Sequence, residues 1–250
     1  MKVSAVLFDL GNTLLEYSLQ GRWDEFLRQR LEEMYPLIFD NVRPAGLSAA
    51  DFAEQVGEIV GGRGRLVEQN GHSWHFGKRL SEGLAAVGVK LEAAQLERLT
   101  DFFYQPVRAG ASLYPETCEV LAQLRAAELK LVIITNSPWD VPLRLMRGDL
   151  AQWDLDRFFD AVICSGNLAW RKPNPDFMFA AAEKVGVLPA GCLVVGDNLQ
   201  ADIAGAQAAG MKSVWINRTG EARAAGAPQP DWEIKSLTEL LRLESINISF

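Results

Sequence analysis

The sequence predicts an α/β protein with a doubly wound, Rossmann-like parallel sheet and an inserted all-helical domain. Five short runs rich in Val, Ile and Leu are each followed by small or polar residues, which is typical of buried parallel strands. Helical patterns separate the later runs, so strand and helix alternate as they do in doubly wound sheets. The five runs are residues 3–8, 131–134, 161–164, 193–195 and 213–216.

Four helical segments are predicted between these strands. Pro115 lies in the first turn of the pattern over residues 115–127, where proline's missing N–H is not needed. Gly210 closes the pattern over residues 201–209, since glycine is favoured just past the end of a helix. The other two patterns cover 142–151 and 176–185, and a surface loop over 221–230 precedes a last strand and helix over 232–243.

The stretch from residue 17 to residue 105 has no strand-like run. It carries four amphipathic patterns, over 23–34, 51–60, 74–86 and 91–103, and Ser48 with Asp51 forms a capping box. We therefore expect a core domain of residues 1–15 and 109–250 and a helical cap domain of residues 16–108. An insertion after the first strand lies over the carboxyl ends of the strands, where open α/β sheets bind ligands. The cap is thus predicted to be a mobile lid, with hinges near residues 15–18 and 106–111.

Composition and charge exclude several classes of function. The 250 residues are 48% hydrophobic and carry a net charge of −7 without a basic block, so neither nucleic acid nor an anionic membrane is expected as a partner. The amino terminus fits neither a signal peptide nor a membrane span of about 20 apolar residues, which predicts a cytoplasmic protein. Cys118, Cys164 and Cys192 lack the spacing of a disulfide framework or zinc site. A small molecule is the expected partner.

Polar side chains follow four of the predicted strands. Taken alone, each has an ordinary explanation, since an acid can cap a turn or helix, a hydroxyl can start a helix, and a lysine can be a solvated charge. They are Asp9 after the first strand, Thr135 and Asn136 after the second, Lys172 after the third, and Asp197 and Asp202 after the fourth.

Taken together, these residues predict a covalent phosphoryl-transfer site. A nucleophilic carboxylate, a hydroxyl that binds the transferred group, a cation and a metal held by acids are the parts that this reaction needs. The spacing of Asp197 and Asp202 suits Mg²⁺, which takes one or two carboxylates with waters and phosphate oxygens.

The order of these residues resembles the four motifs of the haloacid dehalogenase superfamily. The matching motifs are Asp9 to Thr13, Thr135 with Asn136, Lys172 with Pro173, and Gly196 with Asp197 through Asp202. Residues 113–115, 158–160 and 202–211 are also similar to the branch whose helical cap follows the first motif. The resemblance covers about residues 1–15 and 110–243 and leaves the cap unmatched by motif.

The resemblance implies a magnesium site and a nucleophile. Asp9 would attack phosphorus and form an aspartyl phosphate. Mg²⁺ would be bound by Asp9, the main-chain carbonyl of Gly11 and Asp197, with Asp202 supporting the metal or orienting the lysine.

It also implies how the phosphoryl group is held. Thr135 and the Asn136 amide would bind the phosphoryl oxygens, and Lys172 would neutralise the charge shared by nucleophile and phosphate. The implied activity is a phosphatase acting on a small phosphorylated metabolite, as a monomer or homodimer.

Gly11 departs from the family pattern, because family phosphatases carry a second Asp at this position. That acid protonates the leaving alkoxide and then activates water, and losing such a group typically costs about 10² to 10⁴ in rate. Asn12 cannot replace it, since an amide does not titrate near neutral pH. Glu16, His72 and His75 in the insertion are candidate substitutes, unless the substrate is an acyl phosphate whose leaving group needs little acid.

Three functions therefore stay open: a phosphohydrolase, a dehalogenase or phosphonatase, and a non-catalytic relative that binds a phosphorylated ligand. Family dehalogenases and phosphonatases also lack the second Asp, but Asp197 and Asp202 fit metal use and argue against metal-free dehalogenase chemistry. A phosphonatase needs a cap lysine, for which Lys78 is the candidate.

The cap also holds aromatic and basic residues that suit an anionic organic substrate, although most of the aromatics are expected in its core. These residues are Trp23, Trp74, Phe76, Arg63, Arg65, Lys78 and Arg79.

Overall fold

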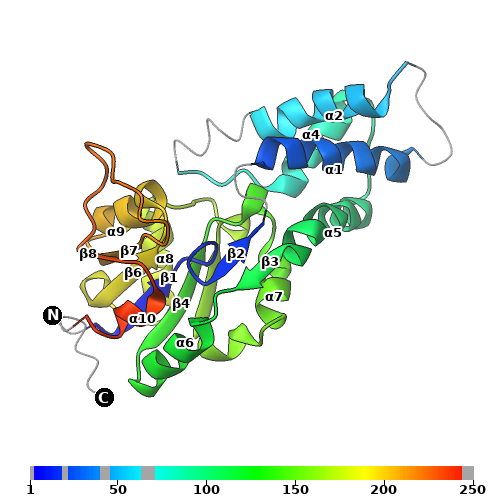
Figure 1. Ribbon diagram of the computed structural model, residues 1–250. Coiled ribbons are helices and arrows are strands. Elements are labelled where there is room, and N and C mark those ends of the chain that lie inside the picture. Colours follow the sequence, from blue (N-terminus) through cyan, green and yellow to red (C-terminus); the bar gives the residue numbers. More distant parts are fainter. Residues whose placement is uncertain (1–2, 19–21, 40–45, 63–70, 244–250) are drawn as a thin grey trace.

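A six-stranded parallel sheet lies at the centre of the core, with helices on both faces (Figure 1). The computed structural model describes residues 3–18, 22–39, 46–62 and 71–243. The strand order is β5-β4-β1-β6-β7-β8, and every neighbouring pair is parallel, so the predicted α/β class is confirmed. The strands are β1 (Ala5–Phe8), β4 (Lys130–Thr135), β5 (Ala161–Cys164), β6 (Cys192–Gly196), β7 (Lys212–Ile216) and β8 (Trp232–Ile234).

The central strand β1 is apolar at every position because it is buried on both faces. Val6 and Phe8 join the hydrophobic cluster on one face, while Ala5 and Leu7 join the cluster on the other. The first face is covered by α6 (Thr117–Ala126), α7 (Leu143–Ala151) and α10 (Leu237–Leu240), and the second by α8 (Pro175–Lys184) and α9 (Ala204–Ala208). No helix in the described part of the chain is long and apolar enough to cross a membrane.

Several helix starts differ from the sequence prediction by a few residues. The predicted helix over 115–127 begins at Thr117, and the predicted helix over 201–209 begins as a π-helical turn, Leu199–Ile203, before α9. Asn198 caps that turn through its side-chain oxygen, which accepts from two backbone N–H groups. Short 3₁₀ turns occupy Pro138–Asp140, Leu155–Phe158, Ser165–Asn167 and Pro189–Gly191.

Every described element between residues 18 and 110 is helical. The capping box at Ser48 forms as the sequence predicts, with Ser48 Oγ accepting from the Asp51 N–H at 3.1 Å. The aromatic side chains of Trp74 and Phe76 are buried, whereas Arg63 and Arg65 lie outside the described residues. The helices are α1 (Trp23–Ile38), α2 (Ala49–Gly57) with a π-helical extension (Glu58–Gly62), α4 (Phe76–Ala86) and α5 (Ala93–Ala109).

A short antiparallel pair of strands, absent from the sequence prediction, joins the two ends of this insertion. Strand β2 (Leu15–Tyr17) pairs with β3 (Ala111–Leu113), about 100 residues later, and each has only three residues, too few to show an alternating pattern. The two connections expected to be separate hinges are therefore hydrogen-bonded to each other. The expected domain boundaries fall inside β2 and inside α5.

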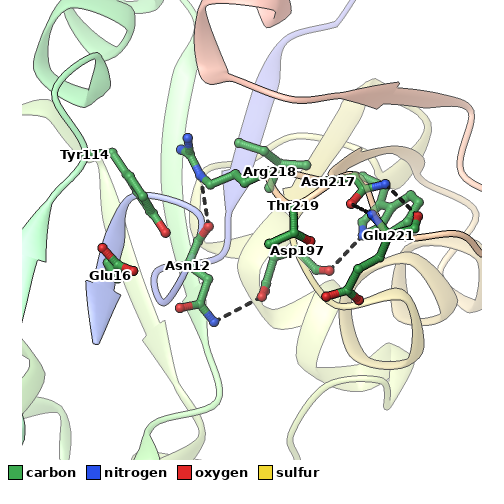
Figure 2. A pocket seen from close by; sticks show the side chains of 10 residues that line it. Asn12, Glu16, Tyr114, Asp197, Asn217, Arg218, Thr219 and Glu221 are labelled. Atoms are coloured by element: carbon green, nitrogen blue, oxygen red, sulfur yellow. Dashed lines mark hydrogen bonds between the residues drawn. The ribbon is translucent and has the colours of Figure 1, made fainter. Parts of the chain in front are cut away.

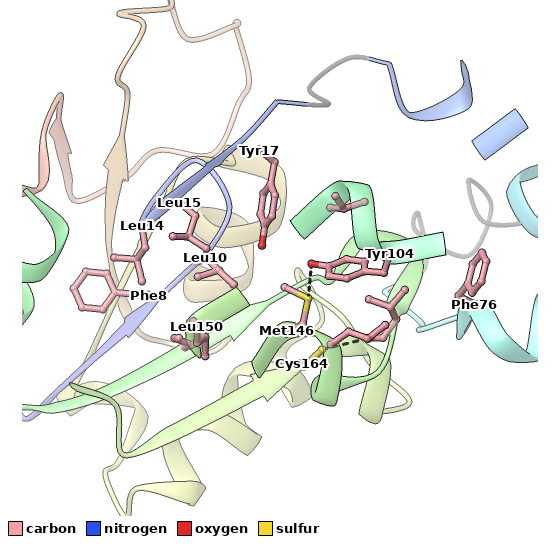
Figure 3. Packing of buried hydrophobic residues seen from close by; sticks show 14 of the residues in the cluster. Phe8, Leu10, Leu14, Leu15, Tyr17, Phe76, Tyr104, Met146, Leu150 and Cys164 are labelled. Carbon is pink, nitrogen blue, oxygen red and sulfur yellow. Dashed lines mark hydrogen bonds between the residues drawn. The ribbon is translucent and has the colours of Figure 1, made fainter. Parts of the chain in front are cut away.

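A buried polar cluster ties this junction to the core. The carboxylate of Asp149 on α7 is fully buried and accepts hydrogen bonds from the hydroxyls of Tyr17 (3.0 Å) and Tyr104. Arg108 on α5 donates to the same carboxylate through Nε at 2.9 Å. Figure 3 shows the two tyrosine hydroxyls turned towards each other. One core carboxylate thus holds both the entry to and the exit from the helical insertion.

Replacing Asp149 with Ala should lower the free energy of unfolding by about 3 to 5 kcal/mol, because it leaves two buried hydroxyls and a guanidinium without their shared acceptor. Asp101→Ala is the matched control, since Asp101 also pairs with an α7 arginine, Arg144, but both side chains are exposed. That surface pair should cost about 0 to 1 kcal/mol. Urea denaturation measures both losses. Equal, small losses in the two variants would contradict the anchoring role of Asp149.

Candidate active site

The strand order brings the predicted site residues to one edge of the sheet. Phe8 is paired with Ile133 of β4 on one side and with Val195 of β6 on the other. The residues that follow these strands therefore emerge next to one another, and the Asp9 N–H still donates to the Val195 carbonyl at 2.9 Å.

Lys172 lies between two acids at this edge. Its Nζ is 2.5 Å from Asp9 Oδ1 and 2.6 Å from Asp202 Oδ1, and it also donates to the Ile134 carbonyl at 2.9 Å. Burial opposes its charge, but Asp202 and Asp9 together raise the Lys172 pKa above its ordinary value. The ammonium group therefore stays protonated across the physiological range.

Three carboxylates meet here and suit a divalent cation. Asp9, Asp197 and Asp202 each offer an oxygen, and these oxygens lie within 4.8 Å of one another. Burial raises the pKa of Asp9 to about 6 despite the nearby Lys172. Burial, together with the charges of Asp9 and Asp202, raises the pKa of Asp197 to about 7. One ammonium does not balance three carboxylates. The cluster therefore has excess negative charge, which Mg²⁺ would offset.

Asn12 adds a second sign that the cluster fits a cation. Its Nδ2 donates to Asp197 Oδ2 at 3.1 Å, which links the loop after β1 to the loop after β6. Its Oδ1 is buried and has no hydrogen-bond partner among the described residues. A buried acceptor without a donor beside three carboxylates suits a metal ion or its water.

Two side chains to which the sequence analysis assigned no role shape the nucleophile's surroundings. Thr13, fully buried, donates from Oγ1 to Asp9 Oδ2 at 3.2 Å, so both oxygens of Asp9 have partners. A Cβ on Gly11 would lie 3.3 Å from two atoms of the Tyr17 ring. The space into which an acid at position 11 would project is therefore bordered by Tyr17, which no motif signals.

Thr135 is the last residue of β4 and Asn136 follows it, as predicted. The Thr135 side chain is largely buried at this strand end. The Asn136 side chain accepts from the Lys172 N–H at 2.9 Å and donates to the Lys172 carbonyl at 3.0 Å. It therefore holds the main chain of the lysine loop.

The helical insertion also holds the lysine loop. The Ser73 N–H donates to the Ala169 carbonyl and the Arg171 N–H donates to the Gly71 carbonyl, both at 2.9 Å. The Trp74 N–H donates to the buried carboxylate of Asp140 at 2.9 Å. Residues 71–74 of the insertion thus pack against the chain that leads directly to Lys172.

The candidate proton donors lie in different places. Glu16 lines a pocket of about 340 Å³ together with Asn12, Tyr114 and Asp197, and Figure 2 shows its carboxylate beside Tyr114. The His75 ring instead contacts the Gly166 carbonyl at 3.1 Å. The His72 ring packs against Trp170, with the ring centroids 4.3 Å apart. Lys78, which is the candidate lysine for phosphonatase chemistry rather than a proton donor, is exposed on α4. Of these four residues, Glu16 is the one that shares a pocket with Asp197.

A family model of haloacid dehalogenase-like hydrolases matches residues 3–210 of this chain. The chain belongs to this family. The N-acylneuraminate-9-phosphatase of Mus musculus is 32% identical over 122 residues, covering 48% of this chain and 47% of that protein. The chain thus spans about half the length of the curated relatives matched in this way.

Two further relatives match over most of the length of this chain. The glyceraldehyde 3-phosphate phosphatase of Methanopyrus kandleri is 30% identical over 220 residues, covering 86% of this chain and 84% of that protein. The solved structure of a haloacid dehalogenase-type phosphatase from Thermococcus onnurineus superposes with a TM-score of 0.63 at 28% identity and covers 100% of both chains. The family and the fold predicted from the sequence are confirmed.

Proposed function

We propose that this hydrolase is a Mg²⁺-dependent phosphatase that hydrolyses a small phosphorylated metabolite through an aspartyl phosphate on Asp9. The observation that carries the proposal is the placement of the Asp9 carboxylate against the Lys172 ammonium, with Asp197 and Asp202 within 4.8 Å. Two relatives named as phosphatases, at 30% and 32% identity, support the reaction class. In the same proposal, residues 16–108 form the cap over a core of residues 1–15 and 109–250.

Asp9, the Gly11 carbonyl and Asp197 are the proposed ligands of Mg²⁺, with Asp202 beside them. When bound, the ion would neutralise part of the charge on the phosphoryl oxygens. A carboxylate oxygen of Asp9 attacks phosphorus as the bond from phosphorus to the leaving oxygen breaks. Water then attacks the same phosphorus, which releases phosphate and returns the Asp9 carboxylate.

The other side chains of the proposed site bind and position. The Lys172 ammonium stabilises the charge that nucleophile and phosphoryl group share. The Thr135 hydroxyl, at the end of β4, would donate to a phosphoryl oxygen. The Asn136 side chain keeps the Lys172 main chain in place through its two hydrogen bonds. Positioning and electrostatics of this kind account for most of the catalysis of phosphoryl transfer.

The leaving group must depart without an acid at position 11. We propose that Glu16 protonates the leaving oxygen, or that the natural substrate is an acyl phosphate, whose leaving carboxylate needs no proton. The exposed position of Lys78 gives no support to phosphonatase chemistry, which requires a lysine that reaches the substrate. The carboxylate cluster supports metal use rather than metal-free dehalogenation.

A phosphate-release screen tests this function. We expect turnover of acyl and aryl phosphates in Mg²⁺, slower turnover of alkyl phosphates, and none in EDTA. Halide release from 2-haloacids without phosphatase activity would identify a dehalogenase instead. Binding of phosphorylated ligands in Mg²⁺ with no release of phosphate from any substrate would identify a non-catalytic relative.

Mg²⁺ should also stabilise the folded protein. At 100 times its dissociation constant, a ligand of the folded state alone contributes about 2.7 kcal/mol. For a chain of this size, that corresponds to a rise in Tm of roughly 5 to 10 °C. Thermal unfolding in Mg²⁺ and in EDTA measures the rise, and Asp197→Asn should abolish it. Asp231→Asn, which changes an acid outside the cluster, should retain it. The same rise in Asp197→Asn would place the bound ion elsewhere.

A further inference from the structure

Arg218, which follows β7, reaches back to the loop that carries the nucleophile. Its Nε donates to the Asn12 carbonyl at 3.2 Å and its Nη2 donates to the Thr13 carbonyl at 2.9 Å. Its Nη1 donates to the Glu116 carboxylate at 2.8 Å, so all three guanidinium nitrogens are used. Figure 2 shows the side chain extending from its loop towards Asn12.

The guanidinium of Arg218 is itself held rigidly. It lies over the ring of Tyr114, with its central carbon 3.6 Å from the ring centroid. Burial opposes the charge of Glu116, yet the hydrogen bond from Arg218 helps to hold the Glu116 pKa below its usual range. The planar guanidinium is thus fixed by its ion pair with Glu116 and by its contact with the ring of Tyr114. Lysine cannot replace arginine in such a setting.

The loop that Arg218 contacts contains a residue with an unfavourable backbone conformation. Asn12 has a φ of 58°, in the left-handed region that side-chain-bearing residues seldom adopt. This residue directly follows Gly11, whose carbonyl is a proposed Mg²⁺ ligand, and its side chain reaches Asp197. The Gly11 carbonyl shares a peptide plane with the Asn12 N–H, which donates to the Leu15 carbonyl. Holding the carbonyls of residues 12 and 13 restricts the turn that orients this plane.

A residue near the end of β7 also contacts Asp197, the cluster acid that follows β6. The indole Nε1 of Trp215 donates to the main-chain carbonyl of Asp197 at 2.8 Å. Side chains from one strand end, Trp215 and Arg218, thus contact both acid-bearing loops, the one after β1 and the one after β6. Hydrogen-bonding partners behind the ligands typically change metal affinity 10- to 100-fold when they are removed.

We infer that Arg218 is a positioning residue that sets the geometry of the magnesium site by holding the carbonyls of Asn12 and Thr13. The inference rests on the proposed function for the identity of the metal. It assigns a role to the loop after β7, a segment that none of the four motifs includes.

The test compares Mg²⁺ binding by calorimetry in the wild type, Arg218→Met, Arg218→Lys and Arg223→Met. Arg218→Met keeps the length of the side chain and removes the fork, and should weaken Mg²⁺ binding by about 10- to 100-fold. Arg218→Lys keeps the charge but offers one point contact, so an intermediate loss is expected. Arg223 is exposed, and its replacement should leave the affinity unchanged.

Thermal unfolding in EDTA separates this role from general stabilisation of the fold. Two results overturn the inference: wild-type Mg²⁺ affinity in folded Arg218→Met, or a loss of affinity in Arg223→Met equal to that in Arg218→Met. If Arg218→Met does not fold, Arg218→Lys decides, and unchanged affinity there overturns it too. A wild type that binds no Mg²⁺ refutes the proposed metal dependence and the inference together, whereas wild-type binding with unchanged variants refutes the inference alone.

Discussion

Replacing Asp9 with Asn should lower phosphate release by at least about 10⁴-fold, because an amide cannot act as the nucleophile. The substitution keeps the shape of the side chain. Lys172 retains its ion pair with Asp202 at 2.6 Å, so the loop that carries it should stay in place. Steady-state phosphate release measures the loss, and substrate should still bind.

Asp176→Asn is the matched control for this change. Asp176 is an exposed acid in the first turn of α8, the helix that follows Lys172, and it lies outside the carboxylate cluster. Its replacement should change phosphate release by less than about twofold. Acid quenching of the wild-type protein during turnover should leave phosphate on the peptide that contains Asp9. Phosphate release by Asp9→Asn at the wild-type rate would show that the nucleophile is another group, such as water activated at the metal.

Sequence reasoning placed the carboxylate cluster because the arrangement follows from topology. Parallel strands present their carboxyl ends at one edge, so a polar residue directly after β1 and one directly after β6 must meet there. Asp9 and Asp197 are such residues. Strand topology does not fix the position of Lys172, because this residue follows a long loop after β5. Its position depends on Asn136 and on residues 71–74 of the insertion.

Two of the contacts that the sequence does not predict join residues far apart in the chain. Strand β2 pairs with β3 across the whole insertion, although neither has an alternating pattern. Arg218 meets the carbonyls of Asn12 and Thr13 from about 200 positions away. A lone arginine or a three-residue strand carries no local signal, since its partners are defined only by the folded sheet.

The position of Tyr17 changes what can be expected of an acid at position 11. Gly11 does not have a positive φ, so its backbone accepts a residue with a side chain. The constraint is the Tyr17 ring, 3.3 Å from the site of a new Cβ and tethered through its hydroxyl to Asp149. A shift of a few tenths of an ångström in that ring admits the acid, and Tyr17→Phe removes the tether.

Gly11→Asp should therefore restore a proton donor and raise kcat/KM for alkyl phosphates by about 10²-fold or more, while acyl phosphates gain little. The leaving group decides the difference, because an alkoxide needs a proton on departure and a carboxylate does not. Gly11→Asn is the matched control, since it has the same size and the same contact with Tyr17 but cannot donate a titrating proton. If Gly11→Asp alone is crowded, the same comparison in a Tyr17→Phe background relieves it. A folded, Mg²⁺-binding Gly11→Asp variant that gains no more than Gly11→Asn on alkyl phosphates would show that the missing acid does not limit this enzyme and would direct attention to Glu16.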